Sequence, residues 1–272
     1  MAITKALVLA ILGCLCFGSS VLAARELSDD LLMVARHESW MVQYGRVYKD
    51  AAEKVHRLEV FKANVGFIES FNAGNHKFYL GINQFADITN EEFKAKRANK
   101  GYKPSLERAP TEFRYENIKA VRGLMDDAFK FIISNGGLTA ESSYPYTAED
   151  GKCKSRSNSA ATIKSYEDVP ANNESALMAA VASQPVSVAV DGGDMTFQFY
   201  KGGVMTGSCG TDLDHGIAAI GYGTTNDGTK YWLLKNSWGT TWGKNGYLRM
   251  EKDISDKKGM CGLAMEPSYP TE

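Results

Sequence analysis

Two short segments in the C-terminal half of the chain carry side chains that could take part in nucleophilic catalysis. Leu213-Asp214-His215-Gly216 offers an imidazole, and Lys235-Asn236-Ser237-Trp238-Gly239 offers an amide followed by an indole. A thiol nucleophile needs an imidazole to keep it ionised and to protonate the leaving amine, and a third group to fix the imidazole ring. A single histidine is more often a satisfied core residue, so His215 is a candidate only in company with the Asn-Ser-Trp-Gly segment.

The cysteines do not supply an evident nucleophile. Cys14 and Cys16 lie in an N-terminal apolar segment, which leaves Cys153, Cys209 and Cys261. An odd count in a secretory chain implies a free thiol or a missing partner. Lysines on both sides of Cys153 would favour its thiolate a little. A Gly-Lys-Cys-Lys loop, however, is not the helix N-terminus that most favours a reactive cysteine, so Cys153 as nucleophile is the weaker interpretation.

The N-terminus has the pattern of a secretory signal over residues 1–23. Lys5 gives the positive start, Ala6 to Phe17 is apolar but short for a membrane span, and Val21-Leu22-Ala23 fits a cleavage site. A membrane anchor is the rival interpretation. Elsewhere, 31 basic residues against 32 acidic ones give a net charge of −1, which argues against a dedicated nucleic-acid surface.

Helical patterns come before strand-like ones along the chain. Residues 31–72 and roughly 90–100 are predicted to be helical, residues 101–117 a linker, and residues 123–135 a helix that ends at Gly136-Gly137. Short apolar runs between Gly, Pro and Asn turns then predict a small antiparallel barrel or sandwich. These runs are Pro185–Val190, Phe197–Tyr200, Ile217–Tyr222, Tyr231–Leu234 and Tyr247–Met250.

Six residues in the first helical region fall along one stripe of a helix. Their spacings of 4, 4, 3, 4 and 4 suit 3.6 residues per turn, and the first two form an acid-then-base pair one turn apart. The stripe consists of Glu53, Arg57, Phe61, Asn64, Ile68 and Asn72. Physics alone indicates only an amphipathic helix.

The residue types of this stripe match the ERFNIN signature of papain-family propeptides, and Gly81-Ile-Asn83-Gln-Phe85-Ala-Asp87 matches the G-x-N-x-F-x-D motif that follows it. The chain therefore resembles the papain-like cysteine proteases, and among them the plant cathepsin L-like enzymes of the senescence-associated kind. The resemblance implies an α+β fold with a helical inhibitory propeptide (24–117), a remnant of the helical half-domain (118–160) and an antiparallel β-barrel half-domain (161–272).

The resemblance also implies roles for individual residues. His215 would be the base, Asn236 the group that orients it, and Trp238 the cover of their hydrogen bond. Cys209 and Cys261 would form a disulfide, and Cys153 would be a structural cysteine whose partner is missing. The substrate-binding positions would be Gly123, Leu124, Met125, Ala189, Leu213, Asp214 and Trp238.

The chain departs from the family between Asn117 and Gly123. A long stretch is expected there, carrying the nucleophilic cysteine and the glutamine of the oxyanion hole, and the sequence runs almost directly across it. We therefore expect an endopeptidase relative that is inactive as written. The alternatives are a propeptide-bearing inhibitor or binding module acting in trans on intact relatives, and a splice product or gene-model error without a function of its own.

Further expectations concern ligands and location. The resemblance implies peptide or protein substrates, intact papain-like proteases as partners through the propeptide, and no cofactor. We expect no nucleic-acid partner, no membrane association after signal removal, and a secretory, extracellular or vacuolar/lysosomal location. Asp212 and Asp214 beside His215 could suggest a metal site, but no metal-ligand spacing appears, and Asp214 is better interpreted as a cleft-rim residue. Asn173-Glu-Ser175 is an N-glycosylation sequon that could equally be an unused surface loop.

Overall fold

The structure is a computed structural model, and it describes residues 28–97, 124–145, 159–207 and 209–272. The expected signal peptide and linker, Gly123 and Cys153 lie outside these residues. The chain divides into two compact units, Met1–Gly66 and Phe67–Glu272. Among the described residues, no helix is long and apolar enough to cross a membrane.

The first unit contains two helices where the sequence pattern suggested one. A helix over residues 28–43 ends near Gly45, whose φ of +61° suits glycine, and α2 (Ala51–Asn72) begins after Asp50. The Asp50 carboxylate accepts the Glu53 backbone N–H at 2.8 Å, while the Glu53 carboxylate accepts the Lys49 N–H at 3.0 Å. This reciprocal capping starts a new helix, so the continuous helical prediction was wrong at residues 44–50.

The predicted stripe of α2 is the face that this helix buries. Phe61, Asn64 and Ile68 are all buried, and the Phe61 ring lies against the rings of His37 and Trp40 in the preceding helix. Glu53 and Arg57 approach to 3.9 Å, the outer limit of an ion pair. Burying Phe61 contributes about 2 kcal/mol, far more than such a partly exposed pair.

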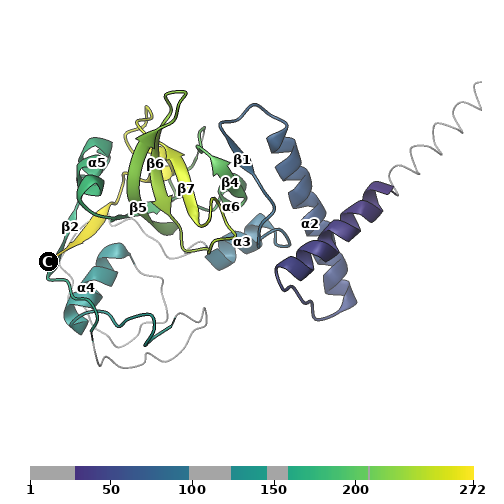
Figure 1. Cartoon of the computed structure of the whole chain (residues 1–272), viewed down its shortest axis with the longest axis horizontal. Coiled ribbons are helices and arrows are strands. Elements are labelled where there is room, and N and C mark those ends of the chain that lie inside the picture. Colours follow the sequence, from purple (N-terminus) through teal and green to yellow (C-terminus); the bar gives the residue numbers. More distant parts are fainter. Residues whose placement is uncertain (1–27, 98–123, 146–158, 208) are drawn as a thin grey trace, which may run out of the picture. The chain divides into compact units, whose positions relative to one another are not determined.

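The second unit is built on an antiparallel sheet of six strands in the order β2-β8-β3-β5-β6-β7. Figure 1 shows β5, β6 and β7 side by side, in green to yellow. The strands span Ser165–Asp168 (β2), Val186–Val190 (β3), His215–Thr224 (β5), Lys230–Lys235 (β6), Tyr247–Glu251 (β7) and Ser268–Thr271 (β8), with the 3-10 turn η2 (Met260–Gly262) before β8.

One face of this sheet forms the core of the unit. In β6, Trp232 and Leu234 are fully buried while Tyr231 and Leu233 are not, as expected from the two-residue repeat of a strand. Helix α5 (Glu174–Ser183) packs against β3 and β5, and its Glu174 carboxylate accepts the indole N–H of Trp232 at 2.6 Å. The predicted strands near β3, β5, β6 and β7 are all present, and the α+β fold is confirmed.

Two further helices lie beside the sheet. Helix α4 (Met125–Asn135) ends at Gly136 with φ +75°, the left-handed cap that the Gly-Gly pair predicts. The run Phe197–Tyr200, in contrast, is not one strand. Asp194 caps a short helix, α6 (Met195–Gln198), by accepting the Thr196 N–H at 2.7 Å, and β4 (Tyr200–Gly203) starts only afterwards.

The end of the propeptide region belongs to this same unit. Strand β1 (Phe78–Leu80) pairs antiparallel with β4 in a two-stranded sheet, and helix α3 (Asn90–Arg97) follows. The amide of Asn72 at the end of α2 both donates to the Leu80 carbonyl and accepts the Leu80 N–H, each at 2.9 Å. The last residue of the predicted stripe thereby fixes the start of the segment that leads to the candidate site.

Candidate active site

His215 and Asn236 come together because their strands are neighbours that run in opposite directions. His215 is the first residue of β5, and Asn236 follows the last residue of β6, with Ala218 paired to Lys235 in the register. The imidazole Nε2 lies 2.8 Å from Asn236 Oδ1. Two residues that are 21 apart in sequence thus form one hydrogen-bonded unit at the ends of two interior strands of the sheet.

The orientation of the Asn236 amide is fixed by its own backbone surroundings. The Ser237 N–H, which can only donate, lies 2.7 Å from Asn236 Oδ1, so the oxygen is the atom that faces His215. The His215 Nε2 must then donate to that oxygen. The other ring nitrogen, Nδ1, is left as the atom that can accept a proton, which is the arrangement a thiol nucleophile requires of its base.

Trp238 covers the hydrogen bond between His215 and Asn236. Its ring stacks on the imidazole with centroids 4.6 Å apart and an interplanar angle of 27°. Trp238 and Asn236 are 8% and 7% exposed. Phe197 and Trp242 meet Trp238 edge-on at 5.5 and 5.0 Å, so the indole is held in place from behind. Excluding water in this way strengthens the hydrogen bond below the indole.

A pair of aspartates lies beside the imidazole. Asp214 accepts the Gly192 N–H at 2.8 Å, and Asp191 accepts the Asp212 N–H at 3.2 Å. Burial raises the pKa of Asp214 to about 6, and the negative charges of Asp191 and Asp212 add to the rise. Burial also raises the pKa of Asp191. The Lys94 charge opposes both shifts, so these carboxylates respond to the propeptide helix α3.

The other expected substrate-binding residues are only partly placed. Ala189 pairs with Gly216 in the sheet, and a Cβ atom on Gly216 would lie 3.9 Å from the sulfur of Met125, so these three residues adjoin. Leu124 precedes α4, and Leu213 is buried with its side chain against Gly262. Their contact with substrate stays a prediction, as does that of Gly123, which lies outside the described residues.

The propeptide segment packs directly on this site. Phe85 and Phe93 meet the Trp238 ring edge-on at 5.6 and 5.2 Å, and Gln84 donates to the Trp238 carbonyl at 2.8 Å. Asn83 donates to the Gln198 carbonyl at 2.7 Å. The Asn and Phe of the Gly81–Asp87 motif are therefore among the residues that attach this segment to the catalytic half.

Several contact residues were missed by the sequence reasoning. Asn90 donates both to the Gly193 carbonyl at 2.9 Å and to the Gln198 side chain at 3.0 Å. Gln198 is fully buried. A buried glutamine needs hydrogen-bond partners, and its position between two phenylalanines was the one sequence signal that pointed to it. Lys94 and Asp191 carried no signal at all.

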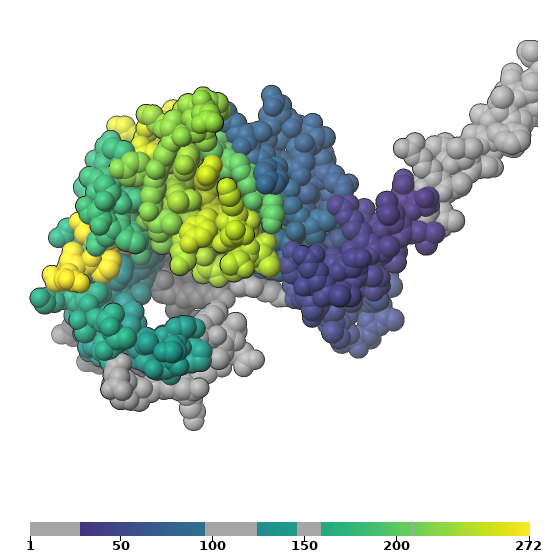
Figure 2. Space-filling model, viewed as in Figure 1, coloured from purple at the N-terminus to yellow at the C-terminus, as the bar shows by residue number. Residues whose placement is uncertain are grey.

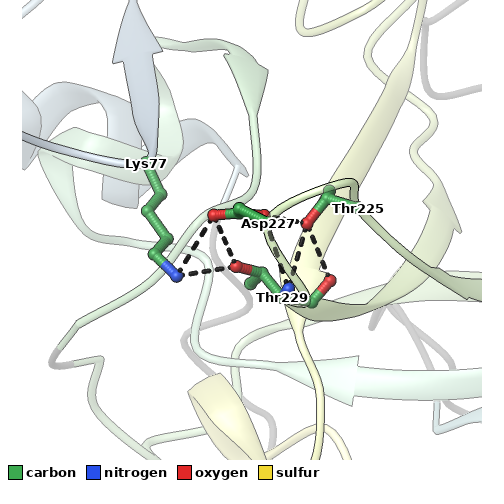
Figure 3. Close-up of polar contacts among 4 residues, drawn as sticks. All are labelled: Lys77, Thr225, Asp227 and Thr229. Carbon is green, nitrogen blue, oxygen red and sulfur yellow. Dashed lines mark hydrogen bonds and ion pairs between the residues drawn. The ribbon is translucent and has the colours of Figure 1, made fainter.

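A second contact of the propeptide lies at the turn between β5 and β6. Figure 3 shows Lys77 pointing at this turn, where its ammonium group donates to Thr229 Oγ1 at 2.6 Å and lies 3.5 Å from Asp227. Thr225 and Thr229 both donate to the Asp227 carboxylate. These hydroxyl groups lower the pKa of Asp227 to about 2, with a smaller contribution from Lys77.

The predicted disulfide is present in the structure, and the predicted glycosylation sequon lies on its surface. Cys209 and Cys261 are joined by a disulfide, the pair that the resemblance implies, and the Cys261 carbonyl accepts the Asp191 N–H at 2.9 Å. The disulfide thus borders the aspartate pair. Asn173 is exposed and its side-chain oxygen accepts the Ala176 N–H at 3.0 Å as the cap of α5, while the use of its sequon stays a prediction.

Comparisons with known proteins agree with this arrangement. Residues 114–271 match the sequence model of the papain family cysteine proteases, and residues 37–93 match that of the cathepsin propeptide inhibitor domain. A senescence-specific cysteine protease of Oryza sativa subsp. indica is 63% identical, with 100% of both chains covered. That of Arabidopsis thaliana is 40% identical, with 97% of both covered.

Solved structures of proenzymes are similar as well. A recombinant stem bromelain precursor has a TM-score of 0.78 and 37% identity, covering 88% of this chain and 99% of its own. Procathepsin L 3 of the Tenebrio molitor larval midgut has a TM-score of 0.75 and 28% identity, covering 89% and 99%. The alignment with the rice relative spans 338 positions against the 272 residues of this chain, so at least 66 positions have no residue here.

Proposed function

We propose that this chain, which belongs to the papain family of cysteine proteases, keeps the base and the orienting group for peptide-bond hydrolysis but lacks the attacking thiol. The observation that carries this proposal is the 2.8 Å contact between His215 and Asn236, together with the pairing of both cysteines found among the described residues. Cys209 and Cys261 are consumed in a disulfide. Cys153 is then the remaining thiol once a signal peptide is removed.

In the family reaction, a cysteine thiolate attacks a peptide carbonyl, and the imidazolium then protonates the leaving amine. The contacts of His215 with Asn236 and Trp238 support a role in the second step. Without the thiol and the oxyanion glutamine there is no acyl-enzyme to form. Loss of the nucleophile from a comparable serine triad lowers turnover about a millionfold, or roughly 8 kcal/mol of barrier.

The absence of an internal segment between Asn117 and Gly123 is part of this proposal. It is supported by the length of the rice alignment and by the single papain-family match over residues 114–271, which spans this position. Amplifying the transcript across these codons tests it. A short product supports a natural isoform, whereas a long product alone assigns the missing segment to the natural protein.

The activity itself is tested on the full chain with fluorogenic peptides that carry a hydrophobic residue two positions before the scissile bond. We expect no thiol-dependent turnover after acid treatment, and no labelling of a cleft cysteine by an epoxide reagent. Cys153→Ala and His215→Ala are the paired variants. Turnover that survives the first and disappears in the second would contradict the proposal, because it would require an unidentified nucleophile.

A second candidate function is inhibition of intact relatives in trans by the propeptide segment. It is favoured by the attachment of Asn83 and Phe85 to the catalytic half, since the same motif residues would attach to a homologous enzyme. In the full chain the motif residues are already occupied by contacts within the same molecule. The isolated segment should therefore inhibit a homologous enzyme better than the full chain does. Absence of inhibition by a segment shown to be folded by circular dichroism would exclude this role.

The same proposal places the protein in the secretory pathway, with an extracellular or vacuolar destination. The support is chemical: the Cys209–Cys261 disulfide persists in oxidising compartments and is rare in the cytosol. Mass spectrometry of the protein from its own tissue tests it, because the mature chain should begin near Ala24.

A further inference from the structure

On the outer face of strands β5, β6 and β7, most side chains are half-exposed among the described residues. Along these strands, residues whose side chains are buried alternate with residues whose side chains are half-exposed or exposed, and the second set points to the outer side of the sheet. Figure 2 shows this part of the chain, in green to yellow-green, as an open surface. We call it the open face and define it by Ala218, Ile220, Leu233, Lys235, Tyr247 and Arg249.

A groove runs across the open face. A pocket of about 440 Å³ is lined mainly by apolar atoms of Ile220, Leu233, Tyr247 and Leu248. Arg249 lines this pocket and also two further pockets, of about 210 and 510 Å³. Isolated exposed apolar residues need no explanation, but a groove of this kind on a sheet indicates a binding surface.

The rim of the groove is positively charged. Lys235 stands opposite Tyr247, Arg249 opposite Leu233, and Lys244 borders the same pocket. Within the described part of the chain, no carboxylate lies within ion-pair distance of any of these three cations. Arg249 instead lies over the Tyr231 ring at 4.8 Å. Two carboxylates lie toward the turn between β5 and β6. Asp227 is already held by Lys77, and Glu251 lies opposite Tyr231, two residues from Arg249 in β7.

We propose that the open face binds an acidic amphipathic segment of another protein, with an apolar ridge in the groove and carboxylates on Lys235, Lys244 and Arg249. The positive charge of the open face and its apolar side chains together favour this partner over a second copy of the chain or a nucleic acid. A second copy of this chain would place the same three cations against one another, which disfavours a dimer through this face. A nucleic acid would satisfy the cations but would leave Ile220, Leu233 and Tyr247 without apolar partners.

The test measures equilibrium binding of labelled synthetic helices to the full chain by fluorescence anisotropy. One 18-residue helix carries a leucine ridge flanked by glutamates, a second replaces the glutamates with glutamines, and a third has the first composition in scrambled order. We expect the acidic helix to bind at least tenfold more tightly than the other two. Raising the salt concentration should weaken its binding, because the charged rim is exposed.

Variants of the chain assign the binding to this face. Arg249→Gln and Lys244→Gln should each weaken the acidic helix about threefold to tenfold, and Leu233→Ser should weaken both ordered helices. Lys257→Gln, an exposed lysine elsewhere, is the matched control and should have no effect. Circular dichroism and thermal melting verify that each variant is folded.

Four outcomes would overturn the proposal. Equal binding of the scrambled helix would indicate a general polyanion surface, and equal binding of the glutamine helix would remove the role of the cations. A dimer in sedimentation that Leu233→Ser dissociates would assign the face to a second copy. Absence of binding by any helix would leave the open face without the proposed partner.

Discussion

The Nε2 atom of His215 lies 2.8 Å from Oδ1 of Asn236, and the Ser237 N–H points at the same oxygen. The backbone of residue 237 thereby decides which tautomer the imidazole adopts. This relationship does not depend on a nucleophile, so it can be measured in a chain that lacks one.

We expect neutral His215 to be the Nε2–H tautomer, because Asn236 Oδ1 can only accept. Nitrogen-15 chemical shifts of the labelled imidazole measure this directly. In Asn236→Ala the fixed acceptor is lost, and the shifts should move toward those of a free imidazole with mixed tautomers. Ser237→Ala keeps the backbone N–H and is the control. A dominant Nδ1–H form in the unaltered chain would contradict the assignment.

Much of this site could be predicted from the sequence because short motifs determine it. The Asn-Ser-Trp-Gly segment after a strand-like run indicated both Asn236 and the covering Trp238, and the Gly-Gly pair predicted the end of α4. The pattern of apolar and polar residues predicted the wrong element where a helix-capping residue determined the local structure. Phe197 and Phe199 alternate as in a strand, yet Asp194 caps a helix there, and Asp50 likewise restarts a helix within a continuous helical pattern.

Contacts between distant segments could not be predicted at all. Lys77 and Thr229 are 152 residues apart, and nothing in either segment indicates the other. The raised pKa of Asp214 is equally invisible in sequence, since it comes mainly from burial beside residues of another strand. Such properties depend on the packing of the whole unit, whereas motifs and caps depend on a few neighbouring residues.

The disulfide should carry a measurable part of the stability of the second unit. Cys209 and Cys261 are 52 residues apart, and closing a loop of that size stabilises a fold by about 2–4 kcal/mol through the unfolded chain. We therefore expect the double variant Cys209→Ala/Cys261→Ala to unfold at lower urea concentration. Cys153→Ala is the control and should unfold like the unaltered chain. Peptide mapping that joins Cys153 to either other cysteine would contradict the pairing.

The contact between Lys77 and Asp227 should hold in mild acid. A carboxylate with a lowered pKa contributes stability that is present above its unfolded value near 3.8 and is lost as the pH falls through its folded value, here about 2. At pH 5 Asp227 is therefore still ionised and the contact still present. Acid alone should not release this end of the propeptide segment.

Hydrogen exchange measures this contact. The Val204 N–H donates to the Lys77 carbonyl at 3.0 Å, so its exchange rate reports on whether the segment is attached. Lys77→Met and Asp227→Asn should each speed this exchange a few-fold, by the same factor at pH 7 and pH 5 after correction for intrinsic rates. Lys164→Met is the control. An effect confined to pH 7 would mean that Asp227 titrates in the acid range.

Asp214 should respond to pH in the opposite way. Its folded pKa of about 6 is above the unfolded value of 3.8, so folding is penalised while the group is ionised. The penalty is fully present above pH 6 and is relieved as the pH falls from 6 toward 4. Because Asp214 is not fully buried, solvent screening reduces the effect to the order of 1 kcal/mol. Acidification should therefore stabilise this side of the site.

Asp214→Asn isolates this effect, because asparagine can still accept the Gly192 N–H but carries no charge. We expect the variant to be more stable than the unaltered chain at pH 7 and equal to it at pH 4, as measured by urea unfolding. Lys94→Met removes an attractive charge and should lower stability at pH 7 more in the unaltered chain than in Asp214→Asn, where only Asp191 of the pair still interacts with it. Asp256→Asn is the matched control, since Asp256 is exposed and also accepts a backbone N–H. A stability gain in Asp214→Asn that is the same at both pH values would show that burial of this carboxylate does not shift its titration.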